Sequence, residues 1–208
     1  MPVERSKPRI AVFDFGGVLI DWDPRYLYRK LFQNEAEMER FLAEICTPDW
    51  NLEQDRGRDW DEAVRLLAER HPDKADLIAA YHLRWEETVR GRVPGTREVL
   101  ADLRARGVRT FAITNFSAPK LKLAQGTYPE MTWFEGVVVS GEVGLVKPDP
   151  AIYHRLLDTY GLDAPDTVFI DDAPKNVDGA RAVGMRGILF RDAAQLRRDL
   201  QDLGLLQS

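Results

Sequence analysis

The sequence of 208 residues has very little cysteine: Cys46 is its single thiol. One cysteine excludes an internal disulfide framework and a cysteine-based zinc site, and it is typical of the reducing cytoplasm. Long apolar runs are also missing, since none approaches the roughly 20 residues that a membrane-spanning helix needs. Nor is there an excess of positive charge: the net charge is −5, which gives nucleic acid and anionic membranes no electrostatic reason to bind. We therefore expect a cytoplasmic protein with no nucleic-acid and no membrane partner.

The composition that is present belongs to a folded globular chain. Hydrophobic residues make up 44% and charged residues 30% of the sequence, which argues against disorder. At roughly 150 residues per domain, the length predicts one domain or a core with an inserted module. A chain of this size can bury about 70% of its unfolded surface, which is enough for one substantial core.

Short, β-rich apolar runs recur along the chain, with helical patterns between the later ones. The runs are residues 10–13, 108–113, 137–139, 168–170 and 188–190. One helix is predicted from the N-cap Asp149 to a stop at Gly161, and another from Thr96 to Gly107. Short buried strands that alternate with helices are typical of right-handed crossovers. The predicted fold is α/β, a Rossmann-like, doubly wound parallel sheet.

The segment between the first two predicted strands is too long for an ordinary crossover. Residues 19–92 are helical by pattern, and Met38, Phe41, Leu42 and Ile45 follow the i, i+3, i+4, i+7 spacing. The sequence therefore predicts a core formed by residues 1–18 and 93–208 and a helical cap formed by residues 19–92. A module inserted directly after the first strand lies over the carboxyl edge of the sheet, where open α/β proteins bind ligands.

Polar side chains follow the predicted strands at the points where they end: Asp14, then Thr114 and Asn115, then Asp171 and Asp172, and, after a longer loop, Lys147. The carboxyl ends of parallel strands converge on one crevice, so these residues can meet despite their separation in sequence. Three carboxylates close together repel one another unless a cation neutralises them, and Mg²⁺ is the usual cation beside a phosphate. A metal, a nucleophilic carboxylate and a phosphate clamp together predict a phosphoryl-transfer site.

This ordered set resembles the haloacid dehalogenase-like hydrolase superfamily, whose members are mostly phosphatases. Its four motifs are matched in order by Phe13-Asp14-Phe15-Gly16-Gly17-Val18-Leu19, Ile113-Thr114-Asn115, Lys147-Pro148 and Phe169-Ile170-Asp171-Asp172. The resemblance covers essentially the whole chain, because the insertion matches the position of the superfamily's helical (C1) cap. The chain is most similar to bacterial sugar phosphatases of the α-D-glucose-1-phosphate type. It also resembles the phosphatase domain of soluble epoxide hydrolase, through Asp171, Asp172 and Asn176.

The resemblance implies a role for each matching residue. Asp14 would attack the phosphorus and become an aspartyl phosphate, while Lys147 would neutralise charge on both nucleophile and phosphate. Thr114 and Asn115, with nearby backbone N–H groups, would hold the phosphate oxygens. The implied ligands of Mg²⁺ are Asp14, the carbonyl of Gly16, Asp172 and, directly or through water, Asp171. The expected substrate-binding residues are Phe15, Gly16, Thr114, Asn115, Lys147, Trp22 and Trp50.

One position departs from the family pattern. Most phosphatases of the superfamily carry a second aspartate two residues after the nucleophile, where it protonates the leaving oxygen and later activates water; here the residue is Gly16. Such general acid–base help is typically worth about 10²–10⁴-fold in rate. Without a donor in place, we expect the rate to depend steeply on the basicity of the leaving group. Asp21 or Asp23 could substitute, although a turn and a helix cap are the simpler roles for them.

The sequence leaves other functions open. A 2-haloacid dehalogenase would use Asp14 on carbon without a metal. Its fourth motif carries serine and asparagine, however, where this chain has two carboxylates that would repel a carboxylate substrate. A catalytically weak binding relative would fit the missing acid at Gly16. A phosphoacceptor receiver is disfavoured, because its paired acids follow the first strand and it has no use for the insertion.

The expected substrate is a small phosphorylated metabolite, because a lid over the site leaves little room for macromolecules. Sugar phosphates are suggested by the resemblance alone. Residues 46–60 lack helical periodicity and combine aromatic, amide and guanidinium groups, so they are interpreted as a substrate-specificity loop or a solvated turn. Trp22, just after the first motif, and Trp50, within this stretch, are predicted at the mouth of the site. The expected oligomeric state is a monomer or a weak homodimer.

Overall fold

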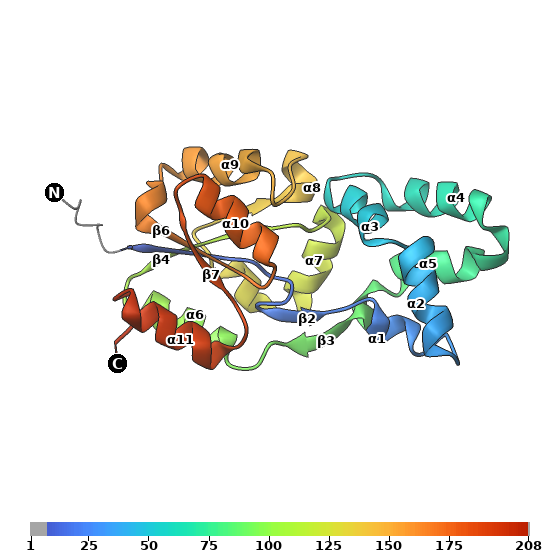
Figure 1. Cartoon of the computed structure of the whole chain (residues 1–208), viewed down its shortest axis with the longest axis horizontal. Coiled ribbons are helices and arrows are strands. Elements are labelled where there is room, and N and C mark those ends of the chain that lie inside the picture. The colour runs from blue at the N-terminus through green and yellow to red at the C-terminus, as the bar shows by residue number, and fades with distance from the viewer. Residues whose placement is uncertain (1–7, 208) are drawn as a thin grey trace.

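The core of the protein is a five-stranded parallel sheet (Figure 1), seen in a computed structural model that describes residues 8–207. Its strands, in spatial order, are β5 (Gly136–Val139), β4 (Arg109–Thr114), β1 (Ile10–Phe13), β6 (Thr167–Asp171) and β7 (Arg186–Leu189). Each corresponds to one of the predicted runs, and all neighbours are parallel, so the predicted sheet is confirmed. Phe13 lies in register with Ala112 and Ile170, and the residues after these strands therefore leave the sheet at one edge.

Helices cover both faces of the sheet, as a doubly wound fold requires. Successive side chains of β1 point to opposite faces. Ala11 and Phe13 pack with α6 (Thr96–Ala105), α7 (Ala118–Thr127) and α11 (Ala193–Asp202), whereas Val12 packs with α9 (Pro150–Tyr160) and α10 (Pro174–Ala182). The remaining short elements of this part are α8 (Ser140–Val143), η3 (Pro129–Thr132) and η4 (Ala164–Asp166).

Helix α9 forms as its capping residues predict. Asp149 accepts a hydrogen bond from the N–H of Ala151 at 2.9 Å, and Pro150 takes the first helical position. Gly161 ends the helix in the left-handed conformation, with a φ of 62°. The N-cap Asp149 lies two residues after Lys147, so it restrains the loop that presents that lysine.

The chain between β1 and α6 forms a second group of helices, drawn at the right of Figure 1. It joins the sheet through two short antiparallel strands, β2 (Ile20–Trp22) and β3 (Val89–Arg92). Its helices are α1 (Arg25–Tyr28), α2 (Glu35–Glu44), α3 (Pro48–Asp55), α4 (Trp60–Arg70) and α5 (Ala75–Leu83), with the 3₁₀ turns η1 (Pro72–Lys74) and η2 (Trp85–Thr88). These helices enclose a hydrophobic core of their own, which includes Tyr28, Met38 and Tyr81.

This segment differs from the expectation in two respects. The ribbon of β2 and β3 is not among the predicted strands. Residues 46–60, expected to lack regular structure, contain helix α3, which begins where Thr47 Oγ1 accepts a hydrogen bond from the N–H of Trp50 at 3.1 Å. The helical character of the insertion is as expected, while its boundaries at residues 19 and 92 stay a prediction.

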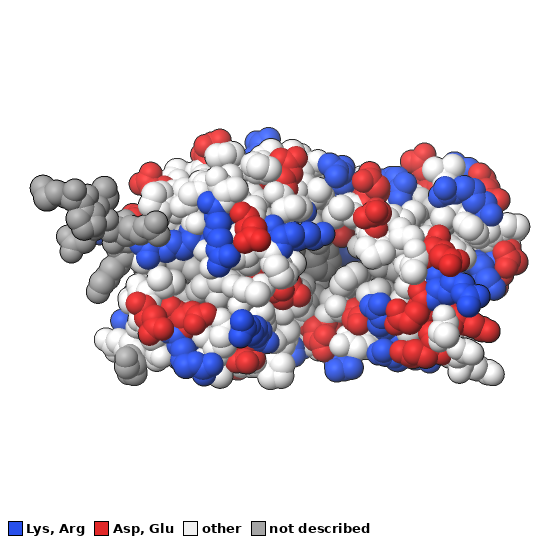
Figure 2. Space-filling view, viewed as in Figure 1, with Lys and Arg blue, Asp and Glu red and all other residues white. Residues whose placement is uncertain are grey.

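The surface carries both signs of charge. Acidic and basic side chains are intermixed over the face shown in Figure 2. Across residues 8–207, no helix combines the length and the apolar character that a bilayer crossing requires.

Candidate active site

Lys147 is the centre of a buried charge cluster at the carboxyl edge of the sheet. Its Nζ lies 2.8 Å from Asp14 Oδ2 and 2.6 Å from Asp171 Oδ2, and its side chain is 1% exposed. Burial by itself would lower the pKa of Lys147, but the two carboxylates outweigh burial and raise it. The ammonium is therefore held in its charged form as the partner of both aspartates.

Asp14 leaves β1 with its carboxylate already fixed. Its backbone N–H donates to the carbonyl of Ile170 at 2.9 Å, and its Oδ1 accepts a hydrogen bond from the N–H of Phe15 at 2.7 Å. Burial raises the pKa of Asp14 to about 7; Lys147 opposes that rise, and the neighbouring carboxylates add to it. A nearby cation would therefore stabilise the ionised form of the Asp14 side chain.

The loop after Asp14 is shaped by Phe15 and by two glycines. The Phe15 ring is fully buried against Phe134, with ring centroids 5.5 Å apart, so this expected substrate-binding residue presents only its backbone to the site. Gly17 has a φ of 72°, and a Cβ there would collide with the carboxylate of Asp172. Glycine is what lets the loop that contains Gly16 come against Asp172.

Asp14, Asp171 and Asp172 form a group suited to a hard cation. Each offers a carboxylate oxygen, and these oxygens lie within 4.8 Å of one another. Oxygen ligands of this kind are those that Mg²⁺ prefers, so the residues fit the implied metal. Asp172 is exposed, whereas Asp171 is completely buried and accepts hydrogen bonds from Lys147 and from Asn176 Nδ2, the latter at 3.0 Å. Partial desolvation of its carboxyl group, followed by the charge of Asp171, raises the pKa of Asp172.

The two polar residues at the end of β4 differ in their contacts. Asn115 Oδ1 accepts a hydrogen bond from the N–H of Lys147 at 2.8 Å, and its Nδ2 donates to the Lys147 carbonyl at 3.1 Å, so this side chain positions the lysine loop. Thr114 is 1% exposed, and its hydroxyl has no hydrogen-bond partner among residues 8–207. A buried hydroxyl without a partner is costly, and a bound phosphate oxygen would supply one.

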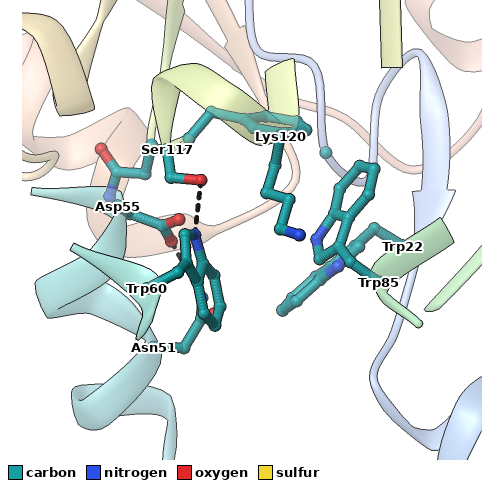
Figure 3. Close-up of a pocket in the computed structure, with 10 residues that line it drawn as sticks. Trp22, Asn51, Asp55, Trp60, Trp85, Ser117 and Lys120 are labelled. Atoms are coloured by element: carbon teal, nitrogen blue, oxygen red, sulfur yellow. Dashed lines mark hydrogen bonds between the residues drawn. The ribbon is translucent and has the colours of Figure 1, made fainter. Parts of the chain in front are cut away.

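A pocket beside this cluster lies between the sheet edge and the helical insertion (Figure 3). The space between the atoms that line it is about 380 Å³, open solvent included. Residues of the core that line it are Gly16, Asn115, Phe116, Ser117 and Lys120, and residues of the insertion that line it are Trp22, Asn51, Asp55, Trp60 and Trp85. The pocket therefore needs both parts of the chain.

Several residues of its wall were not anticipated from the sequence. Trp60 Nε1 donates to Ser117 Oγ at 2.9 Å, which joins the insertion to the start of α7 (Figure 3). Lys120 is 5% exposed; its ammonium lies between Trp60 and Trp85 and donates to the His82 carbonyl at 2.7 Å. Burial lowers the pKa of Lys120. The positions of these residues in the sequence do not indicate that they meet, because they are brought together only by tertiary packing.

Asp55, the last residue of α3, also lines the pocket; it belongs to the stretch 46–60 that was interpreted as a substrate-specificity loop, but it was not singled out there. Its Oδ2 accepts a hydrogen bond from Asn51 Nδ2 at 2.9 Å. Burial raises the pKa of Asp55 to about 8, while a hydrogen bond from the Ser117 backbone opposes the rise. The N-cap and proline at Thr47 and Pro48 were the available signal, since a helix started there places residues four apart on one face.

Of the two tryptophans expected at the mouth, the structure places one there. Trp22 lines the pocket. Trp50 is 8% exposed and lies in the core of the insertion, where its ring centroid is 5.8 Å from that of Trp60 and 5.5 Å from that of Tyr81. Helix α3 turns Trp50 inward and Asp55 toward the pocket, so Trp50 is a packing residue in this arrangement.

The two candidate substitutes for the missing acid are engaged outside the pocket. Asp21 Oδ1 accepts a hydrogen bond from the Tyr26 hydroxyl at 2.8 Å. Asp23 Oδ1 accepts one from the N–H of Arg25 at 2.9 Å, at the start of α1. Asp23 thus forms a turn just before α1, whose N-cap is Pro24 and not Asp23.

Comparisons with known proteins agree with this geometry. A sesquiterpene phosphatase of Aspergillus oryzae is 28% identical to this chain over 198 residues, which are 94% of this chain and 96% of that protein. A drimenol cyclase of Aspergillus calidoustus is 27% identical over 198 residues and 94% of this chain, which spans only 36% of that longer protein. A HAD family enzyme from Bacteroides thetaiotaomicron, solved in complex with magnesium and inorganic phosphate, superposes with a TM-score of 0.65 at 20% identity, covering 91% of this chain and 98% of that one.

The structural likeness establishes the fold, and a family model establishes the membership. The model for haloacid dehalogenase-like hydrolases matches residues 8–184, which include every motif residue from Asp14 to Asp172. The lysine and the two aspartates that meet at the carboxyl edge of the parallel sheet, Lys147, Asp14 and Asp171, all lie within the matched residues. The chain belongs to the haloacid dehalogenase-like hydrolase family.

Proposed function

We propose that this protein is a Mg²⁺-dependent phosphatase that hydrolyses a small phosphorylated metabolite through an aspartyl phosphate on Asp14. The observation that carries the proposal is the group of Asp14, Asp171 and Asp172 around the buried ammonium of Lys147. The sesquiterpene phosphatase that matches nearly the whole chain supports the reaction class. The magnesium and phosphate bound by the Bacteroides relative support the cofactor. In this proposal residues 19–92 act as the cap.

In this proposal one residue of the chain is the nucleophile, and others bind the phosphate and neutralise its charge. An oxygen of Asp14 attacks the phosphorus and displaces the ester oxygen, which leaves as the alcohol. Water later attacks the phosphorus of the aspartyl phosphate, breaks its bond to Asp14 and releases inorganic phosphate. Lys147 neutralises charge on both groups, and Asp171 and Asn115 hold its ammonium and its backbone in place. The unpaired hydroxyl of Thr114 donates to a phosphate oxygen.

The metal would be held by Asp14, Asp172 and the Gly16 carbonyl. Asp171 would act through water, because its oxygens already accept hydrogen bonds from Lys147 and Asn176. When bound, Mg²⁺ supplies positive charge that stabilises the phosphoryl oxygens in the transition state.

The leaving group would occupy the pocket, and the pocket limits its size and character. A pocket closed in between the sheet edge and the insertion suits a small ester. The indole rings of Trp22, Trp60 and Trp85 favour a leaving group with a planar or apolar surface. A sugar phosphate, suggested by the resemblance, stays one member of this class. The absence of nucleic-acid and membrane partners, a monomeric or weakly dimeric state and a cytoplasmic location stay predictions.

A panel of metabolite phosphates tests the proposal. Wild-type protein should release phosphate in the presence of Mg²⁺, and both EDTA and Asp14→Asn should abolish the release. Equal release by wild type and Asp14→Asn would refute the assigned nucleophile. Release of halide from 2-haloacids that survives EDTA would identify the metal-free dehalogenase instead, and binding without turnover across the panel would indicate the weak binding relative.

A further inference from the structure

The loop that carries the nucleophile has no proton donor for the leaving oxygen. Two residues after Asp14 stands Gly16, and, within residues 8–207, no non-neighbouring atom lies within 4 Å of the position that a Cβ would take there. Gly16 nevertheless lines the pocket, so this open space faces the leaving group. Asp21 and Asp23, next along the chain, are engaged with α1. A donor for the leaving oxygen therefore has to come from another element.

Asp55 reaches the same pocket from the helical insertion. In the described part of the chain, it is the one carboxylic acid among the residues that line the pocket. Its side chain is held by Asn51, and its carbonyl accepts a hydrogen bond from Ser140 Oγ at 2.5 Å, which ties the end of α3 to the core. Figure 3 shows Asp55 beside Ser117, whose hydroxyl accepts from Trp60. The carboxyl group itself is held by Asn51 on its own helix and by the backbone of Ser117 in the core.

The surroundings of Asp55 favour its protonated form. Burial raises the pKa of Asp55 to about 8, and the negative charge of Asp14 acts in the same direction. The charged and titratable groups around it are Asp14 and Lys147 from the core, Lys120 on α7 and Tyr81 on α5. A carboxyl that keeps its proton near neutral pH, in the same site as a nucleophilic carboxylate, has the state that a general acid needs.

We propose that Asp55 is the general acid and base of the reaction and takes the place of the aspartate missing at Gly16. The inference rests on the proposed phosphatase function. As Asp14 forms its bond to phosphorus, the bond from phosphorus to the leaving oxygen breaks. That oxygen keeps the electron pair, takes the proton of Asp55 and departs as a neutral alcohol. The Asp55 carboxylate then takes a proton from water, whose oxygen attacks the phosphorus and breaks the bond to Asp14.

This role changes the expected dependence on the leaving group. With Asp55 in place, the rate of the wild type depends only weakly on the basicity of the leaving group, because a basic leaving oxygen is protonated as it departs. In Asp55→Asn the rate should depend steeply on the basicity of the leaving group, as expected for a site with glycine at position 16 and no other proton donor. The contrast is specific to proton donation, since a merely structural defect lowers the rate for good and poor leaving groups alike.

The experiment compares kcat/KM for 4-nitrophenyl phosphate, phenyl phosphate and benzyl phosphate, with Mg²⁺. Asp55→Asn should lose about 10²–10⁴-fold on benzyl phosphate and less than about fivefold on 4-nitrophenyl phosphate, whose leaving group needs no proton. The matched control is Glu53→Gln, an exposed carboxylate on the same helix, which should follow the wild type throughout. Thermal unfolding verifies that each variant is folded.

A second measurement needs no variant. The kcat/KM of the wild type for benzyl phosphate should fall as the pH rises through about 8, the pKa of Asp55. The kcat/KM for 4-nitrophenyl phosphate should show no such fall. Parallel losses of Asp55→Asn across the three esters, or identical pH profiles for the two esters, would overturn the role of Asp55 while leaving the phosphatase intact. If the wild type hydrolyses no ester, the proposed function itself fails, and the role of Asp55 fails with it.

Discussion

Replacing Lys147 by methionine should destabilise the protein strongly. The ammonium lies 2.8 Å from Asp14 and 2.6 Å from Asp171. At an effective dielectric constant of about 20, each contact provides roughly 6 kcal/mol of attraction, and the desolvation of the ammonium cancels several kcal/mol of it. The variant keeps two buried carboxylates with no cation between them. Removing one partner of a buried ion pair in this way costs about 3–5 kcal/mol of unfolding free energy.

The loss should grow with pH. Burial raises the pKa of Asp14 to about 7 even with Lys147 opposing the rise, so without the lysine that pKa is higher still. A carboxyl group with a raised folded-state pKa binds more protons in the folded than in the unfolded state. The free energy of unfolding therefore falls as the pH rises from the unfolded pKa of about 4 to the folded one. Lys147→Met should lose more stability at pH 8 than at pH 5.

Urea denaturation at these two pH values, with EDTA present, measures both effects. Lys122→Met, at an exposed lysine of α7, is the control, and its unfolding free energy should change by no more than about 0.5 kcal/mol. A loss below about 1 kcal/mol for Lys147→Met, well short of the buried-pair value, would refute the reasoning. So would an equal loss at the two pH values, because it would mean that the carboxylates do not become uncompensated.

Three other perturbations follow from particular contacts. Gly17→Ala and Gly107→Ala both force alanine into a positive φ, which costs about 1–2 kcal/mol. Only Gly17→Ala also drives a Cβ into Asp172, so the melting temperature of Gly17→Ala should fall further than that of Gly107→Ala. Arg92→Met leaves the buried carboxylate of Glu130 unpaired and should cost more than about 2 kcal/mol in urea denaturation, whereas Arg109→Met breaks an exposed pair with Glu135 and should cost less than about 1 kcal/mol. Asp55→Asn should melt at a higher temperature than the wild type at pH 9 and not at pH 4, because a folded-state pKa of about 8 makes wild-type stability fall across that range; a constant difference would contradict the raised pKa.

The sheet was predictable because its information is local. Each core strand is a short apolar run, and its partners are fixed by the rules for right-handed crossovers. Helix α9 was equally readable, since Asp149, Pro150 and Gly161 specify its start and its end. The polar residues of the sheet edge follow from the same logic, because parallel strands that end at one edge bring Asp14 and Lys147 together.

The parts of the site that were missed depend on burial and long-range packing. Strands β2 and β3 are short, and almost 70 residues separate them, so no turn signal links them. Trp50 and Asp55 lie on the same helix, and only the packing of α3 against the insertion and the core decides which of the two faces the pocket. Lys120 is polar in sequence and buried in the fold, which composition cannot reveal.

The sharing of the pocket between two parts of the chain has a consequence for how specificity can evolve. In the proposed function, the sheet edge carries the groups that would handle the phosphoryl unit, whereas the insertion carries Trp22, Trp60, Trp85 and Asp55, which would meet the alcohol. Changes in the insertion can therefore retune which esters are accepted, and how strongly alcohol departure is assisted, without disturbing Lys147 and its carboxylates. Divergence toward new metabolites would accordingly accumulate in α3 and its neighbours, while the proposed phosphoryl transfer would stay with the residues at the ends of the strands.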